Sequence, residues 1–104
     1  MERKYESMMV LRPDLTDEVR EEIFQKISKK IEGLGGKLEE AKVWAKDREL
    51  CYFIQSREAD KKEYARGCFW LVNFLIEIQK LPDLKEAIRL EERILRSLII
   101  NKEL

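Results

Sequence analysis

Apolar residues dominate the stretch from Arg66 to Ile76, which is rich in aromatic and β-branched side chains. A short run of this kind predicts a strand that is buried on both faces. Alternate side chains of a strand point to opposite faces, and one set here comprises Trp70, Val72, Phe74 and Ile76. The other set comprises Gly67, Phe69, Leu71, Asn73 and Leu75. We expect the first set to face the domain's own helices and the second, which contains a polar residue, to face a partner.

Two further strands are predicted near the beginning and the end of the chain. Tyr5 to Leu11 is the first, and Pro13 ends it because proline cannot donate a ladder hydrogen bond. In this strand one face carries Tyr5, Ser7, Met9 and Leu11, and the other carries Glu6, Met8 and Val10. Ile94 to Asn101 is the last strand. Its parity places Leu95, Ser97 and Ile99 on one face and Ile94, Arg96, Leu98 and Ile100 on the other.

The middle of the chain predicts a less regular strand. Lys37 to Trp44 does not keep one parity, which indicates a bulge near Glu39-Glu40 or at Ala45-Lys46. Leu50 to Gln55 resumes extended structure, and the polar stretch from Ser56 to Glu63 predicts a hairpin tip. The stretch from Arg66 to Ile76 is therefore the third strand in chain order.

Helical spacing predicts two helices between these strands. Asp14 or Thr16 can cap the first, and Gly35-Gly36 supplies the left-handed turn that ends it. Its apolar stripe comprises Val19, Ile23, Phe24, Ile27, Ile31 and Leu34. The second helix runs from Glu77 to Leu90, with Pro82 accommodated in the first turn. The residues that it turns inward are Leu81, Leu84, Ala87 and Ile88.

The resulting order β-α-β-β-α-β is the ferredoxin-like, or split βαβ, pattern of the α+β class. Right-handed crossovers through both helices predict a sheet in the order four, one, three, two, with both helices on one face in a two-layer sandwich. A chain of 104 residues is one domain by size, so residues 1–104 should form a single ferredoxin-like unit.

The other face of this sheet would remain uncovered. Exposed apolar patches of that size mark interaction sites, so we interpret the uncovered face as a partner interface. Its predicted members are Met8, Val10, Phe69, Leu71, Asn73, Leu98 and Ile100. The same parity adds Ile94 to the patch and places Glu6 and Arg96 beside it.

Charge limits the kind of nucleic-acid contact that the chain can make. Lys plus Arg and Asp plus Glu both number 21, so long-range attraction of a polyanion is not expected and any such contact must be local. One candidate phosphate-facing strip comprises Arg3, Lys4, Arg89, Arg93 and Arg96. The alternative is that these are ordinary surface arginines paired with Glu86, Glu91 and Glu92.

Candidate catalytic chemistry is sparse. The chain has no histidine, no phosphate-cradling glycine loop and no CxxC motif, so we expect neither an enzyme nor a metal or cofactor site. Cys51 and Cys68 are best interpreted as reduced thiols. The pattern shows no apolar leader and no apolar span of membrane length, so we expect a cytoplasmic protein without membrane contact.

The aromatic residues of the third strand invite comparison with RNA-recognition motifs, in which a basic residue and glycine precede stacking rings. Cys68 and Asn73 occupy positions that need rings, and Trp70 belongs to the set expected to face the core. Core packing is therefore the preferred interpretation of these aromatic residues.

Several segments occur together in the order of one known family: Tyr5-Glu6, Pro13, Gly35-Gly36, Trp44, Leu50-Cys51-Tyr52-Phe53-Ile54, Arg66-Gly67-Cys68-Phe69 and Ile88 to Leu98. They resemble the S-six family of bacterial small-subunit ribosomal proteins over nearly the whole chain. The resemblance implies a ferredoxin-like domain that binds the central domain of 16S ribosomal RNA, in the platform, together with ribosomal protein S-eighteen. It also implies no catalysis and no cofactor. Arg89 and Arg96 match arginines of the family's carboxy-terminal motif.

Two hypotheses therefore follow from the sequence. In the first, the chain is a structural ribosomal protein that is monomeric without its partner and binds RNA strongly only in complex with that partner. In the second, a ferredoxin-like domain dimerises through its uncovered sheet face around a small-molecule or regulatory site. Sedimentation discriminates between them, because only the second requires a stable homodimer.

Overall fold

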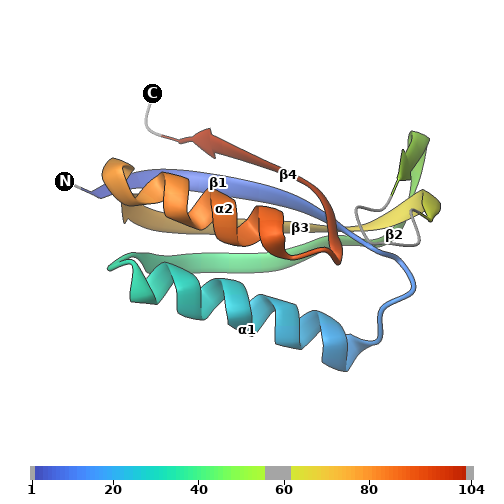
Figure 1. Cartoon of the computed structure of the whole chain (residues 1–104), viewed down its shortest axis with the longest axis horizontal. Helices are drawn as coiled ribbons and strands as arrows, with labels where there is room; N and C mark the ends of the chain where they lie inside the picture. Colours follow the sequence, from blue (N-terminus) through green and yellow to red (C-terminus); the bar gives the residue numbers. More distant parts are fainter. Residues whose placement is uncertain (1, 56–61, 103–104) are drawn as a thin grey trace.

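The computed structural model describes residues 2–55 and 62–102, without the side chains of residues 46 and 51–53. Its elements follow the predicted order (Figure 1). They are β1 (Glu2–Leu11), α1 (Asp17–Gly33), β2 (Lys37–Gln55), β3 (Glu63–Glu77), the 3-10 turn η1 (Ile78–Lys80), α2 (Leu81–Leu90) and β4 (Ile94–Asn101).

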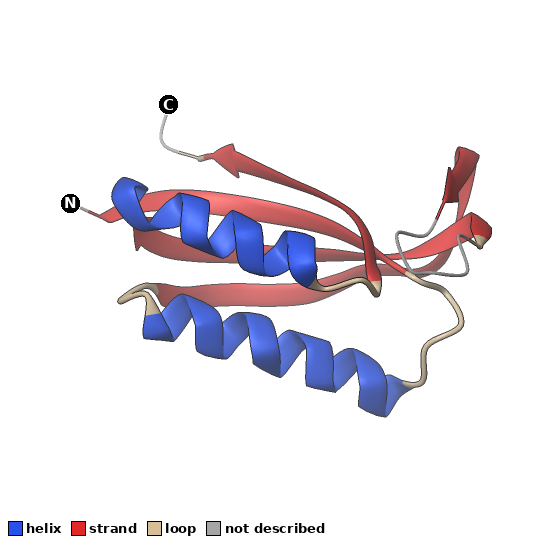
Figure 2. Cartoon of the chain, in the orientation of Figure 1, coloured by secondary structure: helices blue, strands red, loops and turns tan. Residues whose placement is uncertain are grey.

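The four strands form one sheet in the order β2-β3-β1-β4, and every neighbouring pair is antiparallel. Both helices lie against the same side of this sheet (Figure 2). The ferredoxin-like prediction, including its strand order, is confirmed. The two long central strands, β1 and β3, therefore have one face covered by helices and one face without a helical layer.

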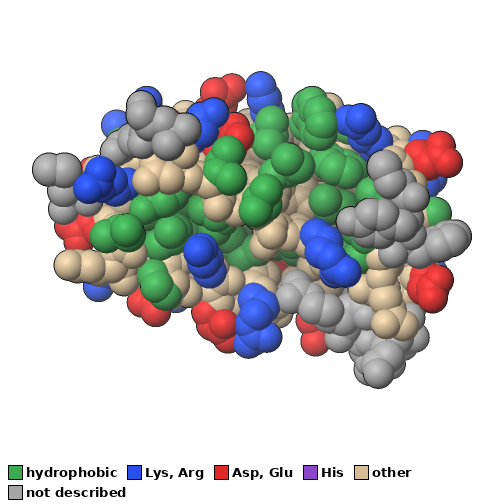
Figure 3. Space-filling view, turned by 90° about the horizontal axis from the view of Figure 1, so that it is seen from above, with side chains coloured by type: hydrophobic (Ala, Val, Ile, Leu, Met, Phe, Trp, Pro, Cys, Tyr) green, Lys and Arg blue, Asp and Glu red, His purple; other side chains and the backbone are tan. Residues whose placement is uncertain are grey.

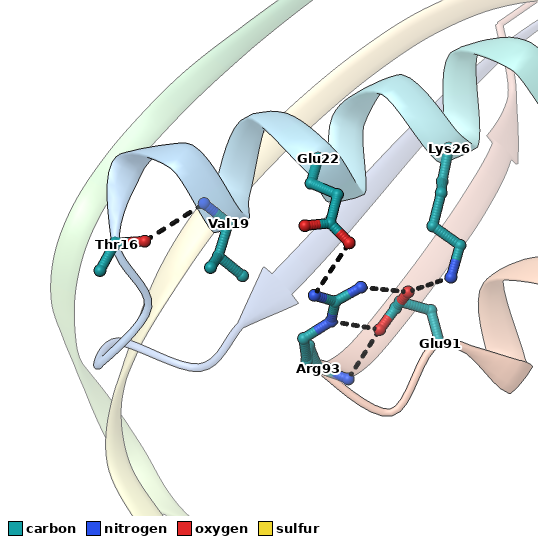
Figure 4. Close-up of polar contacts among 6 residues, drawn as sticks. All are labelled: Thr16, Val19, Glu22, Lys26, Glu91 and Arg93. Atoms are coloured by element: carbon teal, nitrogen blue, oxygen red, sulfur yellow. Dashed lines mark hydrogen bonds and ion pairs between the residues drawn. The ribbon is translucent and has the colours of Figure 1, made fainter.

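Local signals explain where α1 begins and ends. Of the two predicted caps, Thr16 is the one that acts, because its side-chain oxygen accepts a hydrogen bond from the Val19 amide at 3.2 Å (Figure 4). Asp14 instead accepts hydrogen bonds from the Arg12 guanidinium. After the helix, Gly35 has φ of +82°, a conformation that glycine adopts without steric cost and that turns the chain into β2.

The second helix begins later than the sequence predicts. Glu77 is the last residue of β3, η1 follows, and α2 starts at Leu81. Pro82 explains the difference, because it has no amide hydrogen with which to close an α-helical turn onto Ile78. The shorter 3-10 turn takes up these residues before the α-helix starts.

The irregularity predicted for the second strand is confirmed at both candidate positions. The β2–β3 register shifts between Leu38 and Glu40 and again on both sides of Ala45. In spite of these bulges, β2 continues as one strand to Gln55. Of the predicted hairpin tip, residues 56–61 lie outside the described residues.

The helix-covered face holds the main core. The predicted inner set of β3 is confirmed there, with exposed fractions of 6% or less. These side chains pack with the apolar stripes of both helices, and the buried members of the core are Tyr5, Met9, Leu11, Ile23, Ile27, Ile31, Cys68, Trp70, Val72, Phe74, Ile76, Leu81, Leu84, Ile88 and Ile94.

The placement of Ile94 on the uncovered face was wrong. A register shift between Val10 and Leu11 puts Ile94 opposite Leu11 and Arg96 opposite Val10, so Leu95 is an extra residue. One extra residue reverses the parity on its far side. Ile94 therefore lies in the main core with no exposed surface, whereas Leu95 packs in a separate small cluster with Ile54 and Tyr64.

Candidate functional site

The sheet side without helices, called the open face below, carries its side chains in rows across the strands. Leu71 of β3 lies opposite Met8 of β1, which lies opposite Leu98 of β4. The row on one side of this apolar row contains Phe69, Val10 and Arg96, and the row on the other side contains Asn73, Glu6 and Ile100. Across β3, β1 and β4 the middle row of the open face is thus apolar and the rows on either side are mixed. On β2, the exposed Lys42 lies opposite Leu71.

Exposure differs among the predicted interface residues. Leu98 is 60% and Ile100 is 45% exposed, and the side chains of Met8, Phe69, Leu71 and Asn73 are half-buried. Val10 is only 8% exposed, because it packs against Gly67, where an added Cβ would lie 2.6 Å from Val10 Cγ1. Figure 3 shows apolar side chains spread across one side of the molecule, with Lys and Arg side chains among them.

The five sequence-predicted basic residues are not brought together into one strip. Arg96 lies on the open face opposite Val10, whereas Lys4 lies about 20 Å further along β1 at the rise of an extended strand. Arg3 shares the parity of Tyr5 and projects from the other side of β1. Arg89 is exposed on α2 and forms a two-contact ion pair with Glu86.

Arg93 belongs to a cluster of charged residues that come from two parts of the chain (Figure 4). Its guanidinium donates to both carboxylate oxygens of Glu91, at 2.7 and 3.0 Å, and lies 3.8 Å from a Glu22 oxygen. Lys26 of α1 donates to the same Glu91 carboxylate at 3.0 Å. These four residues are called the Glu91 cluster. It ties α1 to the segment between α2 and β4.

The hydrogen bonds from Arg93, and then the one from Lys26, lower the pKa of Glu91 from 4.5 to about 2 in spite of its burial. The side-chain hydrogen bonds between Arg89 and Glu86 likewise lower the pKa of Glu86 and raise the pKa of Arg89. The ion-pair alternative predicted from the sequence is therefore what the structure shows for Arg89 with Glu86 and Arg93 with Glu91.

One cluster on the open face was missed by the sequence interpretation. Trp44 is 49% exposed, and its ring packs edge-on against Phe69 with centroids 5.6 Å apart. The Arg48 guanidinium lies 4.8 Å from the centroid of the Trp44 ring. Trp44 is the extra residue between Val43 and Ala45 in the β2 register. A signal was present in the sequence, namely the broken parity near Ala45, but it did not indicate which way Trp44 points.

A groove of about 180 Å³ lies between α1 and β2, lined by Glu21, Phe24, Ala41, Lys42, Val43, Trp70 and Val72. Within residues 2–55 and 62–102, no group of three or more acidic, cysteine or histidine side chains could hold a metal ion. No helix in the same ranges is long and apolar enough to cross a membrane.

Comparison with known proteins decides the family. The family described as Ribosomal protein S6 matches residues 4–101. This chain belongs to that family. A curated relative from Natranaerobius thermophilus, small ribosomal subunit protein bS6, is 38% identical over 97% of each chain. A relative of the same name from Dictyoglomus turgidum is 32% identical over 93% of this chain and 92% of its own.

A solved structure agrees with this membership. The 30S ribosomal protein S6 of Thermotoga maritima superposes with a TM-score of 0.80 at 26% identity, covering 98% of this chain and 89% of the other. The S6 family is a structural, non-enzymatic component of the small ribosomal subunit of the cytoplasm. The predicted resemblance and the absence of an enzymatic role are therefore confirmed.

Proposed function

We propose that this S6 protein binds 16S ribosomal RNA of the platform together with ribosomal protein S-eighteen. In this proposal the open face docks the partner and basic side chains beside it contact phosphates. The observation that carries the proposal is the open face itself, on which Leu98 and Ile100 are 60% and 45% exposed in a chain of zero net charge. Apolar surface of this kind is stabilised when a partner removes it from water.

The polar residues of the open face support a basic partner. Glu6 and Glu40 lie on either side of Asn73 in one row, and the Lys102 ammonium lies 3.7 Å from the Glu6 carboxylate. A partner that carries lysine or arginine side chains would complement these carboxylates while its apolar residues cover Leu71, Met8 and Leu98. Proteins that contact RNA are often basic, so S-eighteen suits this surface.

The partner also accounts for RNA binding by a neutral chain. Arg89, Arg93 and Arg96 lie toward the α2–β4 end of the molecule, and Arg3 and Lys4 lie toward the other end of β1. We place the main RNA contacts at the α2–β4 end, where Arg96 makes no ion pair with a carboxylate in the described part of the chain. Arg3 and Lys4 would reach a separate stretch of the RNA.

Docking on the open face is tested with two matched variants. Leu98→Asp places a charge in the middle row of the open face. The control is Ile78→Asp, which places a charge at an equally exposed apolar residue (60%) that belongs to η1 and lies outside the sheet. Pull-down of S-eighteen should be lost with Leu98→Asp and retained with Ile78→Asp. Equal retention by both variants contradicts docking on this face.

The RNA contacts are tested by filter binding of platform RNA to the pair of proteins. Arg96→Ala and Arg89→Ala should weaken binding and reduce its salt dependence, whereas Lys29→Ala on α1 should not. The isolated chain should sediment as a monomer and bind RNA weakly. A stable homodimer, or RNA binding by the isolated chain that equals binding by the pair, would remove the partner from the proposal.

A further inference from the structure

The geometry points to a base-stacking site for single-stranded RNA on the exposed ring of Trp44, with Arg48 as its phosphate-binding neighbour. The inference rests on the proposed RNA-binding function and names a contact on β2, which lies at the opposite edge of the sheet from β4. Its ligand is an unpaired nucleotide, whose base has an aromatic face and whose phosphate is an anion.

The two tryptophans of the chain differ in what their rings can contact. Trp70 is 6% exposed and packs against Phe24 in the main core. Trp44 keeps nearly half of its surface exposed, and its edge-on contact with Phe69 fixes its orientation on the open face. A ring that is held in place while it remains accessible is a suitable platform for a base, because little side-chain freedom is lost on stacking.

The charges around Trp44 favour an anion. The neighbouring carboxylate of Asp47 already forms an ion pair with Arg66, whose Nε lies 2.7 Å from Asp47 Oδ1. In the described residues, Arg48 contacts the rings of Trp44 and Phe69 but no carboxylate. Lys42 of the same strand is exposed and forms no ion pair there either. A nucleotide stacked on Trp44 would therefore find cations within reach of its phosphate.

This chemistry predicts which RNA is bound. Every base has an aromatic face, so the site should tolerate different sequences. In a duplex the bases are stacked on one another, so a paired strand cannot offer the same contact. We therefore expect the site to prefer an unpaired segment over a duplex of equal length.

The test measures binding of the full chain, alone and with S-eighteen, to a fluorescent oligouridylate and to duplex RNA of the same length. Trp44→Ala should weaken oligouridylate binding about 10-fold, and Trp44→Phe, which keeps an aromatic ring, by less than about 3-fold. Arg48→Ala should weaken binding about 5-fold, whereas Arg66→Ala, which removes an arginine already paired with Asp47, should have a smaller effect.

Fluorescence supplies an independent measurement. RNA should quench the tryptophan emission of the wild-type protein but not that of Trp44→Phe, in which Trp70 is the only indole left. Unchanged oligouridylate binding by Trp44→Ala would overturn the stacking site and leave the proposed function intact. If Trp44→Ala lost S-eighteen capture but bound RNA fully, Trp44 would belong to the protein interface. That result would also overturn the stacking site. If the wild-type pair binds no platform RNA, the proposed function itself fails.

Discussion

The two faces of β3 differ in what covers them. On the helix side, Val72, Phe74 and Ile76 have exposed fractions of 1% or less, under α1 and α2. On the open face of the same strand, Phe69 and Leu71 are half-buried, and neither α1 nor α2 covers them. The alternation of one strand thus serves two purposes. The helix side stabilises the domain, and the open face is the surface that a partner covers in the proposed function.

Under the proposed function, this difference predicts which residues are needed for folding and which for assembly. Substitutions on the helix side should change the free energy of unfolding of the isolated chain. Substitutions on the open face should change binding and leave that free energy nearly the same. Four stability measurements test this separation, beginning with the largest expected effect.

Phe74→Ala should be the most damaging substitution of the four. Phe74 has no exposed surface and stacks on Tyr5 with ring centroids 5.9 Å apart, so truncation leaves a cavity. We expect a loss of about 3 to 5 kcal/mol in the free energy of unfolding, measured by urea titration with circular dichroism.

The matched substitution on the other face of the strand is Leu71→Ala, which should cost less than about 1 kcal/mol. If Phe74→Ala fails to fold, Phe74→Leu replaces it and should still cost more than Leu71→Ala. Equal losses for the two faces would show that the open face contributes to the stability of the isolated domain as much as the core does.

The fold was largely predictable because its signals are local. The parity of β3, the helical stripes and the caps each depend on residues close together in sequence, and these together determine the strand order. Ile94 was misplaced because the bulge at Leu95 has no sequence signal, since no glycine or proline lies beside it. The bulge is a consequence of how β4 pairs with β1, which spacing within β4 alone does not reveal.

The Glu91 cluster gives the second test, because it connects α1 to the segment between α2 and β4 on the helix side of the sheet. Glu91→Gln removes the charge that Arg93 and Lys26 both contact, and it should lower the free energy of unfolding by about 1 to 2 kcal/mol at neutral pH. Glu92→Gln is the control, since Glu92 is exposed and adjacent, and it should have almost no effect.

The effect of Glu91 should depend on pH. Its pKa is about 2 in the folded protein and 4.5 ordinarily, so the carboxylate stabilises the folded state fully above pH 4.5. That contribution is lost as the pH falls toward 2. The stability difference between wild type and Glu91→Gln should therefore shrink over this range. A difference that stays constant between pH 7 and pH 2 would contradict the role of the charge.

The candidate site was less predictable than the fold. Arg89 and Arg93 are spaced for either ion pairing or phosphate contact, and the sequence left both alternatives open. The contacts of the Glu91 cluster with Glu22 and Lys26 depend on how α1 packs, which spacing along the chain does not reveal. The orientation of Trp44 depends on a bulge in β2, whose position the sequence indicated but whose direction it did not. Side-chain direction after a bulge is a property of strand pairing, and this is why the contact between Trp44 and Phe69 was missed.

The N-cap of α1 is a smaller test of the same face. Thr16→Ala removes the acceptor for the Val19 amide and should cost about 1 kcal/mol. Thr16→Ser keeps an oxygen in place and should cost much less. Because the cap lies away from the open face, S-eighteen capture by folded Thr16→Ala should equal that of the wild type. A loss of capture would show that the two faces are coupled through the helix layer.

Leu98→Ser should have the smallest effect on stability and is the sharpest test of the open face. With 60% of its surface exposed, Leu98 loses little burial when it is shortened, so the free energy of unfolding should change by less than about 0.5 kcal/mol. Leu95→Ser, at a neighbouring residue that is 2% exposed in the small cluster with Ile54 and Tyr64, is the buried counterpart and should cost several times more. Urea titration compares the two. If Leu98→Ser were as destabilising as Leu95→Ser, the apolar residues of the open face would belong to the core of the isolated chain, and a partner would no longer be needed to explain them.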